Sequence, residues 1–344
     1  MARAFITGTA GFIGFHLARS MLREGWGVHG FDAVTDYYDV ALKRRRLALL
    51  AEEAERAGAR HVETEARLED SGALDRALDA ARPEVVVHLA AQAGVRYSLA
   101  NPRAYLDANV TGTFNLMEAV RRRGDEVRHL MMASTSSVYG ANAEMPYGEN
   151  DKADTPMSFY AATKKATEAM GHAYAHLHAI PTTMFRFFTV YGPWGRPDMA
   201  PDLFAGAILA GRPINLYNHG RMFRDFTYID DLIRGIRLLI DAAPPPPAAR
   251  GAGVAGDSLS PVAPWRVVNI GNSERVALLD FVAAIEAATG RAAIRNLMEM
   301  QPGDVPATWA DAGLLGRLTG YRPQTDVREG VARFVTWYRD YHGC

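Results

Sequence analysis

A tyrosine and a lysine four residues apart, Tyr160 and Lys164, are the residues of this chain whose types and spacing most directly suggest chemistry. On a helix, two side chains with this spacing share one face. A lysine ammonium beside a phenol favours the phenolate and lowers the phenol's pKa, which is ordinarily about 10. Together with the hydroxyl of Thr135 upstream, the pair predicts a base that removes a proton from an alcohol.

A glycine-rich loop, Gly8-x-x-Gly11-x-x-Gly14, lies near the start of the chain, after an apolar strand and before a helix. Glycines permit a tight turn and let the backbone approach a pyrophosphate at the positive end of the helix. We therefore expect a dinucleotide beside Tyr160, with a nicotinamide that takes the hydride.

Asp32 ends the second expected strand, where a carboxylate can accept hydrogen bonds from ribose hydroxyls and would repel a 2′-phosphate. This position favours NAD over NADP. The run Lys43-Arg44-Arg45-Arg46 is the competing signal, because it could clasp a phosphate. Such a run is more often the solvated face of a helix.

Three further groups carry polar side chains that could do chemistry. His88 closes an apolar strand at the edge where ligands bind in doubly wound sheets, and we expect a packed histidine there rather than a catalyst. The segment Ser134-Thr135-Ser136-Ser137 closes the next strand, and its hydroxyls can donate hydrogen bonds to a substrate oxygen. His172 and His176 have the spacing of a metal pair, but without a His-Glu-x-x-His motif we expect a surface pair and no metal site.

The composition excludes several classes of protein. Of the 344 residues, 38 are Lys or Arg and 39 are Asp or Glu, a balance that predicts no nucleic-acid or membrane-surface partner. The sequence contains no run of about 18 apolar residues, so we expect no segment that spans a bilayer. The single cysteine, Cys344, allows no intrachain disulfide and, without the apolar core of a signal peptide, favours a cytoplasmic location.

Strand and helix alternate through the first half of the chain, which predicts an α/β fold with a Rossmann-type doubly wound parallel sheet. The rhythm breaks beyond about Val190, which predicts a smaller C-terminal substrate-binding lobe. We expect an NAD-binding domain over residues 1–188, with later segments returning to it, and mainly the substrate lobe over residues 189–344. A stretch rich in Pro, Ala and Gly at about residues 243–264 predicts a flexible surface insertion.

Longer strings of residues carry a resemblance to a known family. The chain resembles the nucleotide-sugar epimerases of the extended short-chain dehydrogenase/reductase family, and within them the UDP-glucuronate 4-epimerases. The resemblance covers nearly the whole chain. The strings that carry it are Asp36-Tyr37-Tyr38-Asp39, Arg186-Phe187-Phe188-Thr189-Val190-Tyr191-Gly192-Pro193, Gly195-Arg196-Pro197-Asp198-Met199, Arg224-Asp225-Phe226-Thr227-Tyr228-Ile229-Asp230-Asp231 and Gln301-Pro302-Gly303-Asp304-Val305.

The resemblance implies an NAD site and a UDP-sugar site with Thr135, Tyr160 and Lys164 as the catalytic residues between them. The residues implied along NAD are Gly8, Gly11, Phe12, Ile13 and Gly14 at the pyrophosphate, Asp32 at the adenosine ribose, Lys164 at the nicotinamide ribose, and Lys43, Leu68, Leu89, Ala90, Ala91, Asn109, Ala133, Tyr160 and Phe187 around the rest. The residues implied along the substrate are Ser136, Ser137, Thr189 and Arg196 at the sugar carboxylate, and Asn215, Tyr217, Arg224, Asp304 and again Thr189 along the UDP.

Two positions depart from the usual pattern of this family. Ala33 stands where an asparagine is usual, and Arg67 stands where an acid near the adenine is usual. Both concern the adenosine end, so they bear on cofactor affinity more than on the reaction. Arg67 also weakens the argument against NADP.

The implied activity is the conversion of UDP-glucuronate to UDP-galacturonate through a 4-keto intermediate, with NAD regenerated in each cycle. Two other enzyme activities stay open, a UDP-glucose 4-epimerase and a UDP-glucuronate decarboxylase. Related decarboxylases carry glutamate where Ser137 stands, which favours the epimerase. A non-catalytic NAD sensor is a further alternative, but such proteins typically lose the Tyr-x-x-x-Lys pair. The expected helices at about residues 104–122 and 159–178 correspond to the family's dimer-forming pair, which implies a homodimer.

Overall fold

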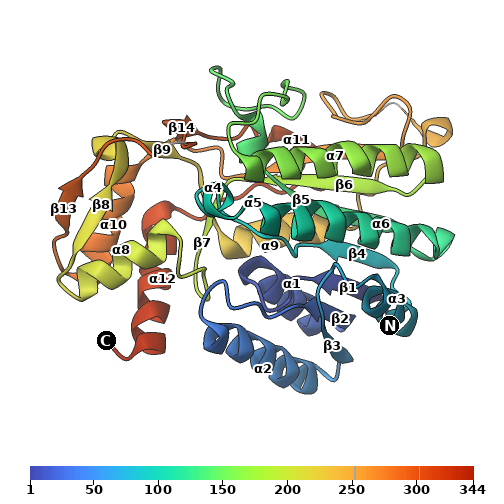
Figure 1. Cartoon of the computed structure of the whole chain (residues 1–344), viewed down its shortest axis with the longest axis horizontal. Helices are drawn as coiled ribbons and strands as arrows, with labels where there is room; N and C mark the ends of the chain where they lie inside the picture. Colours follow the sequence, from blue (N-terminus) through green and yellow to red (C-terminus); the bar gives the residue numbers. More distant parts are fainter. Residues whose placement is uncertain (252, 302) are drawn as a thin grey trace.

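A sheet of parallel strands in the order β11-β6-β5-β4-β1-β2-β3 forms the centre of the computed structural model (Figure 1). The structure describes residues 1–251, 253–301 and 303–344, so Ala252 and Pro302 of the predicted insertion and of the last family string lie outside it. This strand order is that of a doubly wound fold, and the predicted fold class is confirmed. The strands are β1 (Arg3–Thr7), β2 (Gly27–Asp32), β3 (His61–Glu65), β4 (Val85–His88), β5 (His129–Thr135), β6 (Thr182–Phe187) and β11 (Trp265–Ile270).

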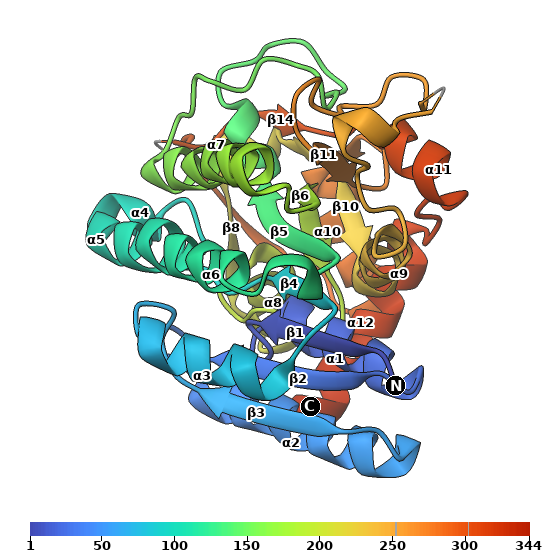
Figure 2. The same cartoon turned by 90° about the vertical axis from the view of Figure 1, so that its right-hand side faces the viewer.

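Helices cover both faces of the sheet (Figure 2). On one face α1 packs against α2 and α9, and α9 packs against α11; on the other, α3, α6 and α7 lie side by side. All side chains of β4, β5 and β6 are buried, as expected for strands covered on both faces. The helices are α1 (Phe12–Arg23), α2 (Val40–Ala57), α9 (Ile229–Leu239), α11 (Gly313–Thr319), α3 (Ser71–Ala81), α6 (Gly112–Arg121) and α7 (Phe159–His178).

The sequence places a cap at the start of several of these helices. The side chain of Asp39 accepts a hydrogen bond from a backbone N–H in the first turn of α2, and Asp70 and Ser158 do the same for α3 and α7. The helix expected at about residues 104–122 is composite in the structure. It consists of α5 (Pro102–Tyr105), the π-helical segment η1 (Leu106–Thr111) and α6, preceded by the short α4 (Tyr97–Ala100).

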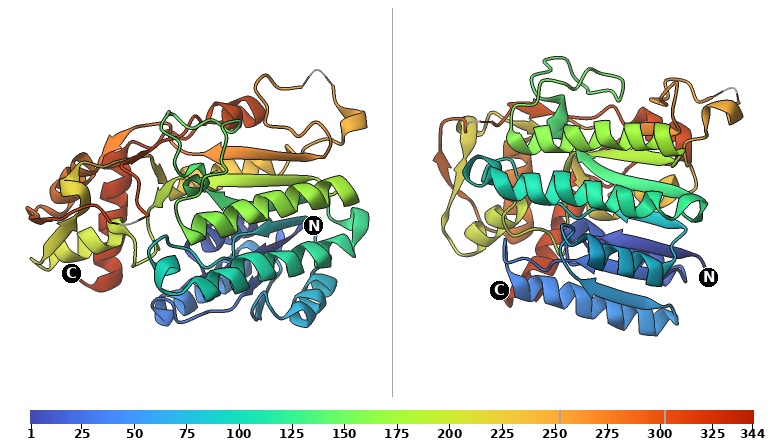
Figure 3. Two further views of the ribbon diagram at one scale, coloured as in Figure 1. Left: turned by 45° about the horizontal axis from the view of Figure 1, so that its top comes forward. Right: turned by 45° about the vertical axis from the view of Figure 1, so that its right-hand side comes forward.

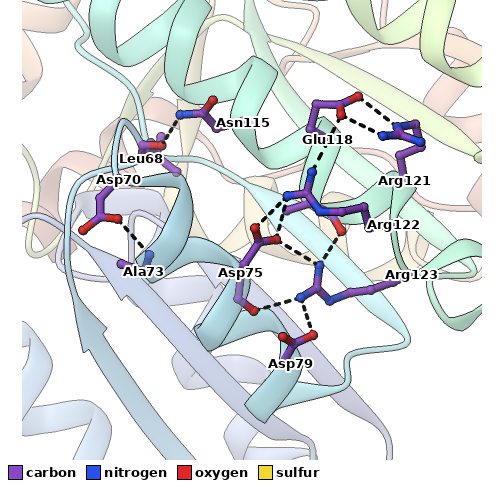
Figure 4. Close-up of polar contacts among 11 residues, drawn as sticks. Leu68, Asp70, Ala73, Asp75, Asp79, Asn115, Glu118, Arg121, Arg122 and Arg123 are labelled. Carbon is purple, nitrogen blue, oxygen red and sulfur yellow. Dashed lines mark hydrogen bonds and ion pairs between the residues drawn. The ribbon is translucent and has the colours of Figure 1, made fainter.

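Ion pairs fasten α3 to α6 on the outer surface (Figure 4). Arg122 Nη2 lies 2.7 Å from Asp75 Oδ1, and Arg123 Nη2 lies 2.5 Å from Asp79 Oδ1. Within α6, Glu118 pairs with Arg121 at 2.9 Å. These contacts hold α3, which packs on β1 and β2, against the C-terminal end of α6.

Many of the later segments, in yellow to red, gather at one end of the main sheet in both views of Figure 3. They form small sheets in which β7 pairs with β10, β9 lies between β12 and β14, and β8 pairs with β13. These elements are β7 (Thr189–Tyr191), β8 (Pro213–Leu216), β9 (Phe223–Arg224), β10 (Phe226–Tyr228), β12 (Val276–Ala277), β13 (Ile294–Leu297), β14 (Ala307–Thr308), α8 (Ala200–Leu209), α10 (Leu278–Thr289) and α12 (Val327–His342), with the short helical turn η4 (Tyr217–Gly220). Of the other short helical turns, η2 (Gly124–Glu126) and η3 (Ser136–Tyr139) flank β5, and η5 (Pro247–Ala249) lies in the predicted insertion. The domain boundary at residues 188–189 stays a prediction.

Part of the predicted insertion contacts the main sheet and α7. Ser258 donates a hydrogen bond to Val267 of β11, and the Ser260 hydroxyl lies 2.8 Å from His172 Nε2. Across the described residues, none of the helices is both long enough and apolar enough to cross a membrane.

Candidate active site

A cleft of about 1170 Å³ runs from the carboxyl ends of the central strands to the C-terminal segments. Ligands of doubly wound folds bind in this crevice. The structure brings together nearly all of the predicted site residues, which come from loops far apart in the sequence. Those lining the cleft are Gly8, Gly11, Phe12, Ile13, Gly14, Asp32, Lys43, Leu68, Leu89, Ala90, Ala91, Ala133, Thr135, Ser136, Ser137, Tyr160, Lys164, Phe187, Thr189, Arg196, Asn215, Tyr217, Arg224 and Asp304.

Asn109 is the one predicted site residue that does not line the cleft. It is buried, and its side chain exchanges two hydrogen bonds with the backbone of Gln92, one accepted at 2.8 Å and one donated at 3.0 Å. It also donates to the Thr163 hydroxyl at 3.1 Å. Because Gln92 lines the cleft, Asn109 supports its wall from behind.

The glycine loop is shaped so tightly that side chains would not fit. A Cβ atom on Gly14 would lie 2.1 Å from the Gly8 carbonyl oxygen, and one on Gly8 would lie 2.8 Å from the Ala90 nitrogen. Gly8 also has φ +84°, which a glycine adopts at low cost. Gly11 is the N-cap of α1 and lines the cleft, and no side chain caps this helix. The first N–H groups of α1 are therefore left without a side-chain acceptor at this point of the cleft.

Asp32 sits at the far end of the glycine loop, where its carboxylate accepts hydrogen bonds from Ala10 N at 3.0 Å and Val34 N at 2.8 Å. Burial raises the pKa of Asp32, against the effect of these hydrogen bonds and of Lys43. Lys43 donates to the Thr35 carbonyl at 2.5 Å, and burial lowers its pKa. Both residues line the cleft beside the glycine loop, and their predicted roles, that of Asp32 at the adenosine ribose and that of Lys43 along the cofactor, stay predictions.

The basic run on α2 is not one solvated face, contrary to the expectation from its charge. Lys43 and Arg46 are buried, whereas Arg44 pairs with Glu65 and Arg45 pairs with Glu52 on the outside. The helical period explains why only two of the four are buried. Lys43 and Arg46 are three residues apart and share the inner face of α2 with the buried Leu42 and Leu50.

Tyr160 and Lys164 both lie in the cleft wall, and burial dominates their electrostatics. Burial raises the pKa of Tyr160, opposed by the Thr135 hydroxyl and by the charge of Arg196. Burial lowers the pKa of Lys164 to about 8, opposed by Glu168. The charge that opposes the rise in the pKa of Tyr160 is that of Arg196 and not that of Lys164, so the predicted lowering of the phenol's pKa by Lys164 is not found among the described residues. Arg196 is the cation that acts on the phenol.

A loop after β7 places Arg196 in the cleft together with Asp198 and Tyr37. Arg196 donates two hydrogen bonds to the Asp198 carboxylate, at 2.5 Å and 3.1 Å. The Tyr37 hydroxyl donates to the same carboxylate at 3.3 Å. The guanidinium is thus held in a defined orientation, close to Tyr160.

Arg96 is a cleft residue that the sequence analysis missed. Its guanidinium lies 4.3 Å from the centre of the Tyr217 ring and 3.4 Å from an oxygen of Asp304. The available signal was its position in the loop after β4, because loops that follow the carboxyl ends of parallel strands line the ligand crevice.

The three histidines singled out in the sequence take no part in the cleft. His88 is buried between the hydroxyls of Thr7 and Thr113, at 2.8 and 2.9 Å, and burial lowers its pKa to about 3. It is a neutral packed histidine, as predicted. His172 contacts Ser260, and His176 Nδ1 lies 2.9 Å from a backbone carbonyl oxygen. In the part of the chain that the structure describes, no group of three or more His, Cys, Asp or Glu could hold a metal ion.

The GDP-mannose 4,6-dehydratase family matches residues 5–334, and the chain belongs to this family. It is 56% identical over 336 residues to a "Probable UDP-glucuronate 4-epimerase" of Rhizobium meliloti, covering 98% of this chain and 96% of that one. It is 43% identical over 341 residues to UDP-glucuronate 4-epimerase 4 of Arabidopsis thaliana, covering 98% and 75%.

A solved structure with the same architecture is the UDP-glucuronic acid 4-epimerase of Bacillus cereus in complex with UDP-glucuronic acid and NAD. It superposes with a TM-score of 0.84 at 30% identity, covering 98% of this chain and 99% of that one. The resemblance to nucleotide-sugar epimerases of the extended short-chain dehydrogenase/reductase family is confirmed.

Proposed function

We propose that this chain is an NAD-dependent isomerase that converts UDP-glucuronate to UDP-galacturonate by inverting C4. The observation that carries the proposal is the meeting in one cleft of Tyr160, the hydroxyls at the end of β5 and the cation Arg196, beside the glycine loop. A phenol and hydroxyls suit reaction at an alcohol, and an oriented guanidinium suits a carboxylate. A hexuronate carries both groups.

The glycine loop fits NAD, because at Gly8 and Gly14 only a hydrogen atom leaves room for the backbone to approach a pyrophosphate. Asp32 faces the adenosine end and supports a dinucleotide without a 2′-phosphate. When bound, NAD supplies the acceptor and donor of the C4 hydride. Lys164 would hold the nicotinamide ribose.

Tyr160 takes the proton of the sugar's 4-hydroxyl and returns it after the 4-keto sugar has turned over in the cleft. Thr135, whose hydroxyl lies beside the phenol, donates a hydrogen bond to the same sugar oxygen. Arg196 favours the phenolate by its positive charge, which opposes the desolvation of Tyr160. Asn215, Tyr217, Arg224 and Asp304 would hold the UDP while the sugar turns.

The 4-keto intermediate is a β-keto acid, which loses carbon dioxide readily. How firmly the protein holds its carboxylate therefore decides between UDP-galacturonate and a decarboxylated UDP-pentose. Ser136, Ser137 and Thr189 offer hydroxyls and Arg196 a cation for that grip. Holding the carboxylate near the plane of the C4 carbonyl misaligns the bond that decarboxylation would break. Ser137 in place of a glutamate supports the epimerase over the decarboxylase.

The test is to incubate the purified protein with UDP-glucuronate, and separately with UDP-glucose, without added NAD. We expect UDP-galacturonate from the first, identified by the C4 proton couplings in its NMR spectrum, and at most slow reaction of the second. A UDP-pentose as the main product would favour the decarboxylase. Faster reaction of UDP-glucose would favour the neutral-sugar epimerase.

We also propose that the protein is a cytoplasmic homodimer. Leu106, Phe114 and Leu177 are 39%, 45% and 70% exposed along η1, α6 and α7, a face that a second copy would cover. The exposed Cys344 forms no disulfide within the chain, which suits a reducing compartment. Light scattering after size-exclusion chromatography tests the dimer.

A further inference from the structure

Arg46 is an arginine whose side chain has no exposed surface, on the inner face of α2. Its Nη1 atom donates hydrogen bonds to the Ala10 carbonyl and to the Tyr38 hydroxyl, both at 2.8 Å. Its Nη2 atom donates to the carbonyls of Trp194 at 2.7 Å and Gly195 at 2.8 Å. Ala10 belongs to the glycine loop, so one guanidinium joins that loop to a segment more than half the chain away.

A buried guanidinium is expensive unless its donors are satisfied. No carboxylate of the described residues forms an ion pair with Arg46. Its two Nη atoms donate to three backbone carbonyls and one phenol, whereas its buried Nε has no acceptor among the described residues. An apolar side chain there would leave these three carbonyls and the phenol without their common donor, so the two loops are tied to one guanidinium. The contacts of Arg46 therefore point to a requirement for the geometry of the two loops rather than for stability alone.

The segment of residues 192–195 needs support from outside itself. Trp194 has φ +61°, a conformation that costs a bulky L-residue free energy. Besides Arg46, His16 Nε2 lies 2.8 Å from the Pro193 carbonyl oxygen, and the Trp194 ring packs against Phe15, with 5.8 Å between ring centroids. Arg196 follows directly, so its backbone position depends on these contacts.

We propose that Arg46 is a positioning residue that holds Arg196 in place for the substrate carboxylate, by fastening residues 192–195 to the glycine loop. This inference rests on the proposed function, because it assigns the carboxylate grip to Arg196. Arg46 does not line the cleft and acts only through the loop that it holds. Through Arg46, the position of Arg196, which would bind the substrate carboxylate, depends on the position of the glycine loop, which would bind the dinucleotide.

The test compares Arg46→Met with Arg45→Met, the neighbouring arginine whose pair with Glu52 is half-exposed. Binding of UDP-glucuronate and of UDP is measured by calorimetry at saturating NAD, so that a loosened glycine loop does not confound the result. We expect Arg46→Met to bind UDP-glucuronate about tenfold more weakly, the loss of roughly one charge-assisted hydrogen bond, and UDP within about twofold of wild type. Arg45→Met should match wild type for both.

Arg46→Lys keeps the charge but cannot bond all four acceptors, so its affinity for UDP-glucuronate should lie between those of Arg46→Met and wild type. This variant replaces Arg46→Met in the test if the methionine variant does not fold. Equal weakening of UDP and UDP-glucuronate, or no change in either, would overturn the proposal. Failure of both variants to fold would also overturn it, since Arg46 would then be a determinant of the fold. If wild type itself does not epimerise UDP-glucuronate, the proposed function fails first.

Discussion

Glu168 on α7 accepts two hydrogen bonds from Arg186 on β6, from Nε and Nη2, each 2.9 Å long. The two side chains are 1% and 3% exposed. Ser134 donates to the same Glu168 carboxylate at 2.7 Å. Ser134 adjoins Thr135, and Glu168 lies one turn beyond Lys164, so this buried pair fixes the two elements that carry the proposed catalytic residues.

Glu168→Gln should destabilise the protein by about 3–5 kcal/mol at pH 7, because it leaves Arg186 buried without its counter-charge. Urea unfolding monitored by circular dichroism measures the change. The matched control is Glu52→Gln, at an exposed pair with Arg45, where we expect less than about 1 kcal/mol. Equal stability of Glu168→Gln and wild type would contradict this role of the pair.

The same pair predicts how stability depends on pH. Burial opposes ionisation of Glu168, but the hydrogen bonds and charge of Arg186 outweigh it and lower the pKa to about 2. A carboxyl whose pKa is lower in the folded state stabilises the fold above its unfolded pKa, and this contribution is lost as pH falls from about 4.5 toward 2. Wild type should therefore lose its stability advantage over Glu168→Gln across that range. An advantage that is unchanged down to pH 2 would speak against the pair.

Tyr160→Phe should lower kcat by about 10²–10⁴-fold, because the variant cannot take the proton of the 4-hydroxyl. Binding of UDP-glucuronate should change by less than about 1 kcal/mol, since phenylalanine keeps the ring. Tyr174→Phe is the control on the same helix, because the Tyr174 hydroxyl bonds Glu118 outside the cleft. Similar kcat values for Tyr160→Phe and wild type would remove Tyr160 from the mechanism.

Replacing both Ser136 and Ser137 with alanine should raise the share of UDP-pentose among the products, because the carboxylate of the 4-keto intermediate would be held less firmly. Mass spectrometry of the product pool measures this share, since loss of carbon dioxide changes the mass. Ser260→Ala, at a hydroxyl that contacts His172 away from the cleft, is the control. An unchanged product ratio in the double variant would show that these hydroxyls do not protect the carboxylate.

Asp32→Asn should improve the affinity for NADP relative to NAD by about tenfold, because the variant removes one carboxylate charge from the site of the 2′-phosphate. Arg67, which lines the same cleft, should contribute to any NADP binding, so Arg67→Ala should weaken NADP binding more than NAD binding. Competitive binding of the two dinucleotides tests both variants, with the exposed Arg60→Ala as control. A wild-type protein that prefers NADP would overturn the assignment of Asp32.

Local sequence patterns were enough to predict the glycine loop, the sheet and the helix that carries Tyr160. The loop conformation follows from glycines at fixed offsets, and Lys164 must share a helix face with Tyr160. Charge alone misled at Arg46, because whether a basic side chain faces solvent depends on the phase of the helix against the sheet. The contact of Arg96 with Tyr217 and Asp304 could not be predicted, since it joins three segments that only the tertiary fold brings together.

The electrostatics of the pair Tyr160 and Lys164 could not be predicted from their spacing either. Its four-residue interval predicts proximity, but the pKa of Tyr160 depends on how completely the cleft excludes water and on Arg196, which comes from another loop. The sequence identified the residues correctly as cleft residues and misjudged which cation acts on the phenol.

The most direct test of the account uses UDP-glucuronate labelled with deuterium at C4, incubated with the purified protein in ordinary water without added NAD. If Tyr160 handles only the hydroxyl proton while the C4 hydride passes to a resident NAD and back, the UDP-galacturonate formed keeps its deuterium at C4. Loss of that deuterium to solvent, or an absence of UDP-galacturonate, would contradict the account.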